Sequence, residues 1–349
     1  MTERFEIAGR LIGVDEPVYV IAEMSANHAG SFEEAAQLVR VAADAGADAV
    51  KLQTYRADTM TIDIENPWMT VESGLWEGRN LFDLYREAHT PWEWQPDLRG
   101  IALESGIELF STAFDITSIE FLEEMGVPVH KVASFEIVDL ELVGAMAATG
   151  KPLIISTGMA TLEEIEDAVD TARSNGATQI ALLKCTSAYP AAPQDMNLRA
   201  IPALRNQFGV EVGLSDHTMG IEIPVAAVSL GASLVEKHFT RTRENASADS
   251  EFSLNATELG MMVSAIRNAE QALGYVKFGP SEDEKKSIVF RRSLFVVQDI
   301  EEGEDFSREN VRAIRPGHGI APKHLPDVLG RSATRSIKRG TPLTWDLVE

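Results

Sequence analysis

Short runs of apolar and β-branched residues alternate with longer amphipathic stretches from about residue 17 onward. Such short runs are typical of buried parallel strands, whereas the stretches between them repeat apolar residues at helical spacing. Strands are predicted at 18–23, 49–53, 108–112, 130–134, 152–157, 180–185, 210–215 and 234–238. Helices are predicted between them, for example at 32–47 (after Ser31, a typical N-cap), 162–175, 221–230 and 257–273.

Eight strand–helix units predict an α/β fold, a closed (β/α)₈ barrel. An open, doubly wound sheet is the alternative, and it is disfavoured because no glycine-rich phosphate loop follows the first strand. We expect the barrel domain to span 1–278 and the polar, breaker-rich segment 279–286 to be a linker. Short β-like runs and turns in 287–349 predict a second compact domain, which by its size should pack against another surface.

The segment 54–92 interrupts the alternation and contains Trp68, Trp76 and Trp92. A connection of this length inside a compact domain is usually functional or disordered. The tryptophans favour an ordered flap near the mouth of the barrel. Packing against the outer wall of the barrel is the alternative, and the sequence alone does not decide between them.

Charge and cysteine content narrow the compartment and the partners. The formal net charge is −23, so a nucleic-acid partner is not expected, because phosphate binding needs a basic face. The first residues lack a secretory signal, and no apolar stretch approaches the roughly 20 residues that cross a bilayer. The single cysteine, Cys185, cannot form an intramolecular disulfide, and we expect it to be buried and inert. These observations predict a soluble, cytoplasmic protein without a membrane partner.

Polar residues gather where the predicted strands end, while the strand interiors stay apolar. In a (β/α)₈ barrel the active site lies at the carboxyl ends of the strands. A solvated strand end explains any one of these residues, but the recurrence at all eight strands predicts a site. The set comprises Glu23, Lys51, Gln53, Ser111, Thr112, Lys131, Ser134, Ser156, Thr157, Lys184, Thr186, Ser215, His217, Lys237 and His238.

The lysines of this set suit a phosphate or a carboxylate. Because a one-residue slip turns a strand side chain to the other face, we expect only about half of them to contact ligand. Lys51 and Lys131 are the predicted contacts, and Lys184 and Lys237 are expected to be structural. With hydroxyl donors from three serines they would suit a small dianion or trianion such as phosphoenolpyruvate, the serines being Ser134, Ser156 and Ser215.

Two histidines, His217 and His238, end adjacent predicted strands. They could hold one divalent metal, with water and substrate oxygens as the remaining ligands. A hydrogen-bonded histidine pair is the alternative. Glu23, at the end of the first strand, could hold the substrate or act as an acid–base.

Motifs across nearly the whole chain resemble those of the sialic acid synthase family, in the family's order. They are AEMSANH (22–28), KLQT (51–54), FST (110–112), KVAS (131–134), STGM (156–159), CTSAYP (185–190), GLSDHT (213–218) and EKHFT (236–240). The segment 287–349, with RAIRPG at 312–317, is similar to that family's antifreeze-like (SAF, β-clip) domain. The resemblance implies a TIM barrel followed by this domain, a domain-swapped homodimer, and a transferase that forms a C–C bond with phosphoenolpyruvate.

The resemblance also implies roles for individual residues. Phosphoenolpyruvate would be bound by Lys51, Lys131, Ser134, Ser156 and Ser215. A divalent metal, usually Mn²⁺ with Mg²⁺ or Co²⁺ as alternatives, would be held by His217 and His238. The sugar would be contacted by Glu23, Gln53, Tyr189, Asp249 and, from the partner subunit, Arg315. As a mechanistic hypothesis, Glu136 stabilises the cationic carbon that forms during condensation.

Within the family, four motifs resemble the pseudaminic acid synthases most: GLWEGR (74–79), LFDLY (81–85), TPWEW (90–94) and DSEFS (249–253). Ser187 and Ser250 stand where N-acetylneuraminate synthases carry Asn and His. The implied sugar is 2,4-diacetamido-2,4,6-trideoxy-L-altrose, and its methyl groups suit aromatic residues such as Trp76, Trp92 and Phe252. N-acetylneuraminate or legionaminic acid synthesis, by the same chemistry, is the alternative.

Two other classes of function stay open at this point. A Schiff-base aldolase would use a strand-end lysine of the same barrel. A sugar-binding module would bind ligand without releasing phosphate.

Overall fold

The computed structural model describes residues 4–244 and 247–349. The chain divides into two compact units, Met1–Gly274 and Tyr275–Glu349. The segment 279–286, expected to be a linker, lies in the second unit and contains a short helix, α11 (Glu282–Lys285).

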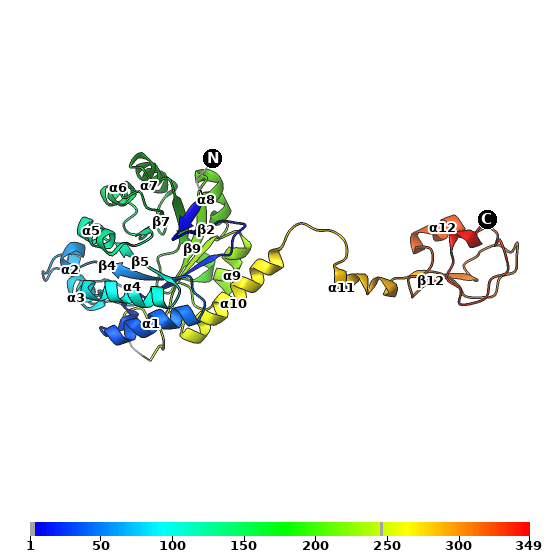
Figure 1. Cartoon of the computed structure of the whole chain (residues 1–349), viewed down its shortest axis with the longest axis horizontal. Coiled ribbons are helices and arrows are strands. Elements are labelled where there is room, and N and C mark those ends of the chain that lie inside the picture. The colour runs from blue at the N-terminus through cyan, green and yellow to red at the C-terminus, as the bar shows by residue number, and fades with distance from the viewer. Residues whose placement is uncertain (1–3, 245–246) are drawn as a thin grey trace. The chain divides into compact units, whose positions relative to one another are not determined.

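The first unit is a closed barrel of eight parallel strands (Figure 1). The strands follow one another around the barrel in chain order, and the last pairs with the first. They are β3 (Tyr19–Glu23), β4 (Ala49–Thr54), β5 (Glu108–Ala113), β6 (His130–Val132), β7 (Leu153–Ser156), β8 (Ile180–Cys185), β9 (Glu211–Asp216) and β10 (Leu234–His238). The predicted fold is therefore confirmed, and all eight predicted strands are present.

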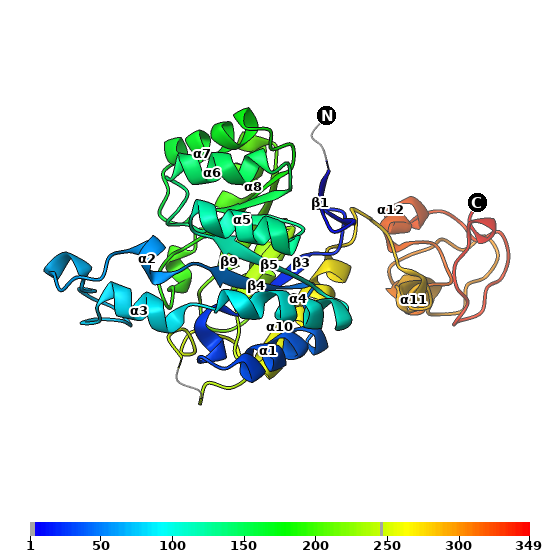
Figure 2. The same ribbon diagram turned by 60° about the vertical axis from the view of Figure 1, so that its left-hand side comes forward.

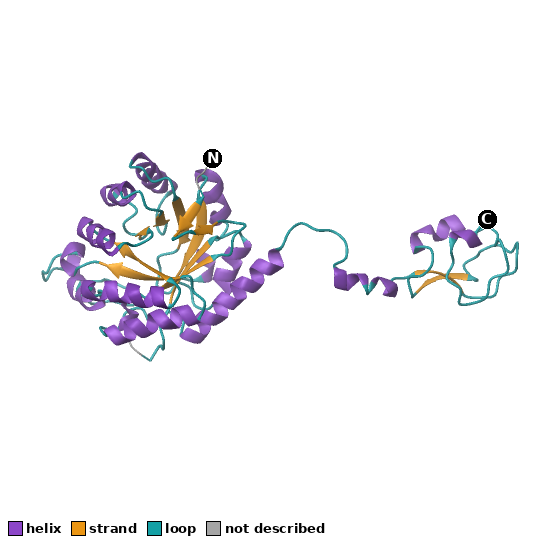
Figure 3. Ribbon diagram, in the orientation of Figure 1, coloured by secondary structure: helices purple, strands orange, loops and turns teal. Residues whose placement is uncertain are grey.

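Helices form the outer layer around these strands (Figure 3). They are α1 (Phe32–Asp44), α4 (Gln95–Glu104), α5 (Ile116–Met125), α6 (Leu140–Ala148), α7 (Leu162–Ser174), α8 (Ala200–Phe208), α9 (Glu222–Ser229) and α10 (Ala256–Leu273). The Ser31 hydroxyl accepts a hydrogen bond from the Glu34 amide at 3.3 Å, which confirms the predicted N-cap. Among the described residues, none of the helices has the length and apolar character needed to span a membrane.

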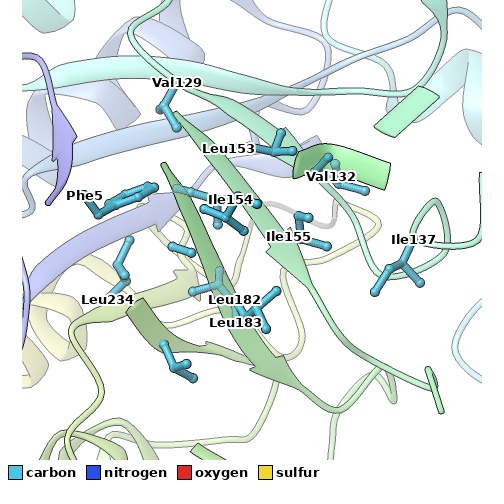
Figure 4. Close-up of a cluster of buried hydrophobic side chains, with 14 of the residues drawn as sticks. Phe5, Val129, Val132, Ile137, Leu153, Ile154, Ile155, Leu182, Leu183 and Leu234 are labelled. Atoms are coloured by element: carbon cyan, nitrogen blue, oxygen red, sulfur yellow. The ribbon is translucent and has the colours of Figure 1, made fainter. Parts of the chain in front are cut away.

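The strands are buried on both faces, between the barrel interior and the helical layer. On β7 and β8, Leu153, Ile154, Ile155, Leu182 and Leu183 are all fully buried (Figure 4). Parallel strands covered on both faces consist of continuous apolar runs, which explains why the sequence pattern located them.

A β-hairpin that was not predicted covers the amino-terminal end of the barrel. Strands β1 (Phe5–Ile7) and β2 (Arg10–Ile12) pair antiparallel around Ala8 and Gly9, both with positive φ. The Glu6 amide donates to the Gln179 side chain, just before β8, at 2.8 Å. Phe5, with only 2% of its surface exposed, joins the barrel's core cluster. The hairpin therefore closes the end of the barrel opposite the predicted site.

The segment between β4 and α4 forms the irregular flap, with two helices, α2 (Ala57–Met60) and α3 (Leu81–Ala88). Figure 2 shows it projecting at the end of the barrel away from the β1–β2 hairpin. Trp76 contacts the site residue Tyr189, whereas Trp92 packs on Phe121 of α5 and Trp68 is 84% exposed. Trp76 therefore lies near the mouth of the barrel, whereas Trp92 packs against its outer wall. Each of the two alternatives holds for one tryptophan.

The second unit has its own apolar core. Two antiparallel strands, β11 (Ser293–Val296) and β12 (Val311–Ile314), form its sheet, and α12 (Leu325–Val328) is a short helix. The core consists of Leu294, Val296, Ile300, Phe306, Val311, Ile320, Val328, Ala333, Ile337, Leu343, Leu347 and Val348. This part of the chain is therefore a small domain with a separate core, as predicted.

Candidate active site

Strand register brings the predicted polar residues together at the carboxyl end of the barrel. On neighbouring strands, His238 pairs with Glu23, and Glu23 pairs with Lys51. On the next strands, Thr112 pairs with Lys131. Residues at the same height on adjacent parallel strands place their side chains close together, so one site is built from separate parts of the chain.

Lys51 is buried between two carboxylates. Its Nζ lies 2.5 Å from Glu23 Oε2 and 3.6 Å from Glu236 Oε1, and it donates to Thr112 Oγ1 at 2.9 Å. Burial lowers the pKa of this ammonium, but the two carboxylates outweigh burial and the net pKa is raised. Lys51 is therefore a charged group whose charge is already balanced by protein carboxylates.

Glu236 belongs to the site, although the sequence pattern did not single it out. It accepts a hydrogen bond from the Ser215 hydroxyl at 3.2 Å, and its Oε2 has no hydrogen-bond partner among the described residues. Burial raises its pKa, but Lys51 and Lys131 outweigh burial and the net pKa is lowered. Glu236 could have been found from the alternation of side chains along a strand. If His238 faces the site, the residue two positions earlier faces it too.

The same alternation turns Lys237 away from the site. Its Nζ lies 2.6 Å from Asp216 Oδ2, in a pair with no exposed surface. Lys184 donates to the Cys185 carbonyl at 2.6 Å and to the Thr186 hydroxyl at 3.3 Å. Both lysines thus have local structural partners, in agreement with the sequence-based expectation.

Lys131 is a buried cation with neutral partners. Its Nζ donates to Ser156 Oγ at 2.7 Å and to the Val132 carbonyl at 2.8 Å, and only 1% of its surface is exposed. Within the described ranges it forms no ion pair, and burial lowers its pKa. Nearby, Ser134 Oγ accepts from the Gly158 amide at 3.1 Å and keeps its own proton to donate. An ammonium without a carboxylate partner is suited to a small anion.

Two glutamates of the site have pKa values raised to about 7. Burial raises the pKa of Glu23 to about 7 although Lys51 opposes it, and burial raises that of Glu136 to about 7 against Lys131. Glu23 Oε1 accepts from the Gln53 amide at 3.1 Å. In the described part of the chain, Glu136 Oε2 has no hydrogen-bond partner. Both groups can therefore take up or release a proton near neutral pH.

The two predicted metal ligands are adjacent, with His217 and His238 ring centroids 5.2 Å apart. His217 Nδ1 lies 2.9 Å from the Thr186 carbonyl, which can only accept, so Nδ1 carries a proton. Burial lowers the pKa of His217, but its contacts with Cys185 and Thr186 outweigh burial and raise it, so Nε2 binds a metal only after the ring has released its second proton. His238 Nδ1 is buried and has no partner among residues 4–244 and 247–349, and burial lowers its pKa well below the usual value. Neutral imidazoles with a free nitrogen fit a divalent metal.

No third protein ligand joins them: in the described ranges, no group of three or more His, Cys, Asp or Glu side chains is arranged to hold a metal ion. A metal held here would therefore take its remaining ligands from water and substrate. The binding of a metal by His217 and His238 stays a prediction.

Cys185 has closer polar neighbours than the sequence indicated. It is buried, but its Sγ lies 3.9 Å from His217 Nδ1 and 3.8 Å from Ser187 Oγ. Burial raises the pKa of the thiol, but hydrogen bonding to His217 outweighs burial and brings it to about 7. The sequence predicted a buried, inert thiol. The thiol is buried, but His217 lies next to it as a base, so the prediction that it is inert is not supported.

An aromatic wall borders the histidines. The Tyr189 ring lies 4.4 Å from the His217 ring and 5.3 Å from the Phe252 ring, and Phe252 lies 4.9 Å from His238. Asp249 is buried beside this wall and accepts a hydrogen bond from the Ser25 hydroxyl; burial raises its pKa although Ser25 lowers it. The predicted sugar-contacting residues of the barrel therefore lie beside the predicted metal ligands.

Arg315 follows β12 in the second unit and is exposed. The prediction that it enters the barrel of a partner subunit concerns a second chain and stays a prediction.

Comparisons with known proteins agree with this geometry. The model of the NeuB family matches residues 38–278, and that of the SAF domain matches 291–349. Pseudaminic acid synthase of Campylobacter jejuni is 44% identical, over 94% of this chain and 96% of its own. N,N'-diacetyllegionaminic acid synthase of Legionella pneumophila is 36% identical, over 95% and 94%. The crystal structure of N-acetylneuraminic acid synthetase from Leptospira borgpetersenii, in complex with citrate, superposes with a TM-score of 0.73 at 33% identity, covering 82% of this chain and 96% of that one.

Proposed function

This chain belongs to the NeuB family, and we propose that it condenses phosphoenolpyruvate with 2,4-diacetamido-2,4,6-trideoxy-L-altrose, giving pseudaminic acid and phosphate. The observation that carries the proposal is the buried Lys131 ammonium, which forms no ion pair among the described residues, at the same barrel end as the adjacent histidines His217 and His238. The first group suits an anionic substrate and the second suits a metal that binds an aldehyde.

Phosphoenolpyruvate would bind along the Lys131 side of the site. The Lys131 ammonium and the hydroxyl groups of Ser134 and Ser156 would supply donors to its phosphate and carboxylate, and the Ser215 hydroxyl would join them by turning away from Glu236. Lys51 would contribute a charge-assisted hydrogen bond while keeping its carboxylate partners. Much of the rate enhancement would come from positioning, because the attacking carbon is held beside the aldehyde.

The charges of the site support a requirement for an added cation. Lys51 and Lys131 act on three carboxyl groups, Glu23, Glu136 and Glu236, and a fourth, Asp249, interacts with His217. A trianion would not be stable there unless carboxyl groups are protonated or further positive charge is bound. A divalent ion at His217 and His238, which we propose to be Mn²⁺ with Mg²⁺ or Co²⁺ as alternatives, would supply this charge and polarise the aldehyde oxygen.

The bond changes follow from this placement. The C3 carbon of phosphoenolpyruvate attacks the aldehyde carbon, and the aldehyde oxygen takes up a proton, for which Glu23 is the proposed donor. The cationic C2 that results is stabilised by nearby anions, including Glu136. Water then adds to C2, and phosphate leaves with the bridging oxygen as the C2–O bond breaks.

The experiment that tests the proposal uses the purified chain with phosphoenolpyruvate, Mn²⁺ and three sugars in separate reactions. The sugars are the altrose derivative above, the corresponding legionaminic acid precursor and N-acetylmannosamine. We expect phosphate release to be fastest with the altrose derivative. Faster release with another sugar would move the assignment to legionaminic or N-acetylneuraminic acid synthesis, and release with none would reject a synthase.

We further propose that the protein works in the cytoplasm as a homodimer in which Arg315 of each chain completes the partner's site. The separate core of the second unit and the exposure of Arg315 support this arrangement. Mixing two inactive variants, His217→Ala and Arg315→Ala, should restore activity after subunit exchange, because one of the two sites is then intact. If the mixture stays inactive while exchange is demonstrated, each chain forms its own site.

A further inference from the structure

We infer that Trp76, on the flap, is a specificity-determining residue whose indole ring contacts the 6-methyl and acetamido end of the sugar. The inference rests on the proposed function, since it assigns a contact to the sugar of that reaction. The sequence named Trp76, Trp92 and Phe252 together as suited to the methyl groups of the sugar, and the structure separates Trp76 from the other two, since Trp92 packs on Phe121 and Phe252 is fully buried.

The flap holds Trp76 at the tip of a closed loop. The Val71 amide donates to the Arg79 carbonyl at 2.9 Å, and the Gly78 amide donates to the Val71 carbonyl at 2.9 Å. Gly74 and Gly78 have positive φ, a conformation that favours glycine, on either side of the tryptophan. The position of the ring is therefore fixed by a hydrogen-bonded turn.

The tip reaches the aromatic wall of the site. The Trp76 and Tyr189 rings have centroids 5.6 Å apart, and the indole N–H donates to the Ala248 carbonyl at 3.1 Å. Ala248 directly precedes Asp249, and Tyr189 in turn stacks on His217. Tyr189 thus lies between Trp76 and the proposed metal ligand His217. Trp76 is on the side where the sugar chain would extend from its aldehyde.

The chemistry of this wall distinguishes a methyl from a hydroxymethyl group. Trp76 and Tyr189 are partly exposed aromatic rings, backed by the buried Phe252, and apolar ring faces gain from contact with methyl groups. A hydroxyl placed against them would lose its water without gaining a protein partner. The wall should therefore favour a 6-deoxy, diacetamido sugar over its 6-hydroxy counterpart.

The chain supplies matched controls in the same segment. Trp68 lies on the flap and is 84% exposed, so its replacement removes an equal side chain without touching the site. Trp92 donates to the Tyr55 carbonyl and packs on Phe121 outside the mouth. If the removal of any flap tryptophan impaired the enzyme, replacing Trp68 or Trp92 would have the same effect.

The test compares Trp76→Ala, Trp76→Phe and Trp68→Ala in the full-length protein. Steady-state kinetics are measured with phosphoenolpyruvate against the 6-deoxy diacetamido sugar and against its 6-hydroxy analogue. For Trp76→Ala we expect the sugar KM to rise about tenfold and the 6-deoxy preference to fall about tenfold, the range of a single apolar contact. The KM for phosphoenolpyruvate should change less than about twofold, and Trp68→Ala should match the wild type.

Trp76→Phe keeps an aromatic face but removes the hydrogen bond to Ala248, and we expect it to retain most of the 6-deoxy preference. If Trp76→Phe is as impaired as Trp76→Ala, the hydrogen bond to the Asp249 loop matters and the ring contact with sugar is refuted. An unchanged preference in Trp76→Ala, or equal rises in both KM values, would also overturn the inference. If the wild type turns over neither sugar, the proposed function fails instead.

Discussion

Replacing the two site lysines by methionine should move the stability of the ligand-free protein in opposite directions. Lys51 is paired with Glu23 and Glu236, so Lys51→Met leaves buried carboxylates without a counter-ion. Removing one partner of a buried pair costs about 3–5 kcal/mol. Lys131 has only neutral hydrogen-bond partners, and burial outweighs the attraction of Glu236 and lowers its pKa, so Lys131→Met removes a buried charge that the carboxylates compensate only in part. We expect it to stabilise the protein by about 1–3 kcal/mol.

The same two changes should impair catalysis alike. Truncating one partner of a buried, hydrogen-bonded charge pair costs about 2–5 kcal/mol of binding free energy, so kcat/KM for phosphoenolpyruvate should fall between about 30-fold and several thousand-fold in Lys131→Met. In Lys51→Met, kcat/KM for phosphoenolpyruvate should fall by a factor in the same range. The KM for the sugar should not rise correspondingly in either variant. Lys131→Met would thus be both more stable and less active than the wild type.

Two measurements check this prediction: urea unfolding of the protein without metal or substrate, and initial rates of phosphate release against phosphoenolpyruvate concentration. Lys184→Met is the control, since Lys184 lies near the end of β8 but donates to the Cys185 carbonyl. The KM of this variant for phosphoenolpyruvate should change less than about threefold. If Lys131→Met destabilises the protein as Lys51→Met does, or leaves kcat/KM intact, the assignment of Lys131 as the anion-binding cation is refuted.

Three further predictions follow from the described contacts. Glu136→Gln should stabilise the protein by about 3 kcal/mol at about pH 8 and by little at about pH 4. The folded-state pKa of Glu136, about 7, lies above the usual 4.5, so the stability of the wild type is lost as the pH rises through this window. Urea titrations at both pH values check this, with the exposed Glu141→Gln as the control. His217→Ala should abolish Mn²⁺ binding in calorimetry as well as turnover; unchanged binding would exclude the histidine pair as the metal site. Phe5→Ala should cost about 3–5 kcal/mol in urea unfolding, whereas exposed Val14→Ala should cost almost nothing; equal effects would contradict the hairpin's place in the core.

The sequence predicted the barrel because its strands are buried on both faces. A largely apolar run such as 180–185 leaves little ambiguity in strand position, and it matches β8 residue for residue. The segment 234–238 also matches its strand, although only its first two residues are apolar. The β1–β2 hairpin was missed because its strands are three residues long, too short for a periodic pattern to emerge. Its only local signal was the Ala8–Gly9 turn between alternating apolar residues.

The candidate site was predictable as far as strand ends could be located. Glu23, Lys51 and Lys131 lie where the pattern placed them. Glu236 was missed because a glutamate inside a buried strand identifies no role until the facing of His238 is known. The pairing of Lys51 with carboxylates, which separates it from Lys131, depends on packing between strands and has no sequence pattern of its own.

Long-range contacts of the flap could not be predicted. Trp68, Trp76 and Trp92 look alike in sequence, yet one is exposed, one reaches the site and one packs on α5. Their difference arises from the closed turn at 71–79 and from a contact with Ala248, 172 positions away. Local patterns carry no information on contacts at such separations.

The most direct measurement of the central claim follows the bridging oxygen of phosphoenolpyruvate. The purified chain is incubated with Mn²⁺, the altrose derivative and phosphoenolpyruvate that carries ¹⁸O between C2 and phosphorus, and both products are analysed by mass spectrometry. If Lys131 and its neighbours hold phosphoenolpyruvate for attack through C3, the label appears in inorganic phosphate and the sugar is a nine-carbon acid. Label retained in the sugar, or phosphate released without a nine-carbon product, would contradict the account.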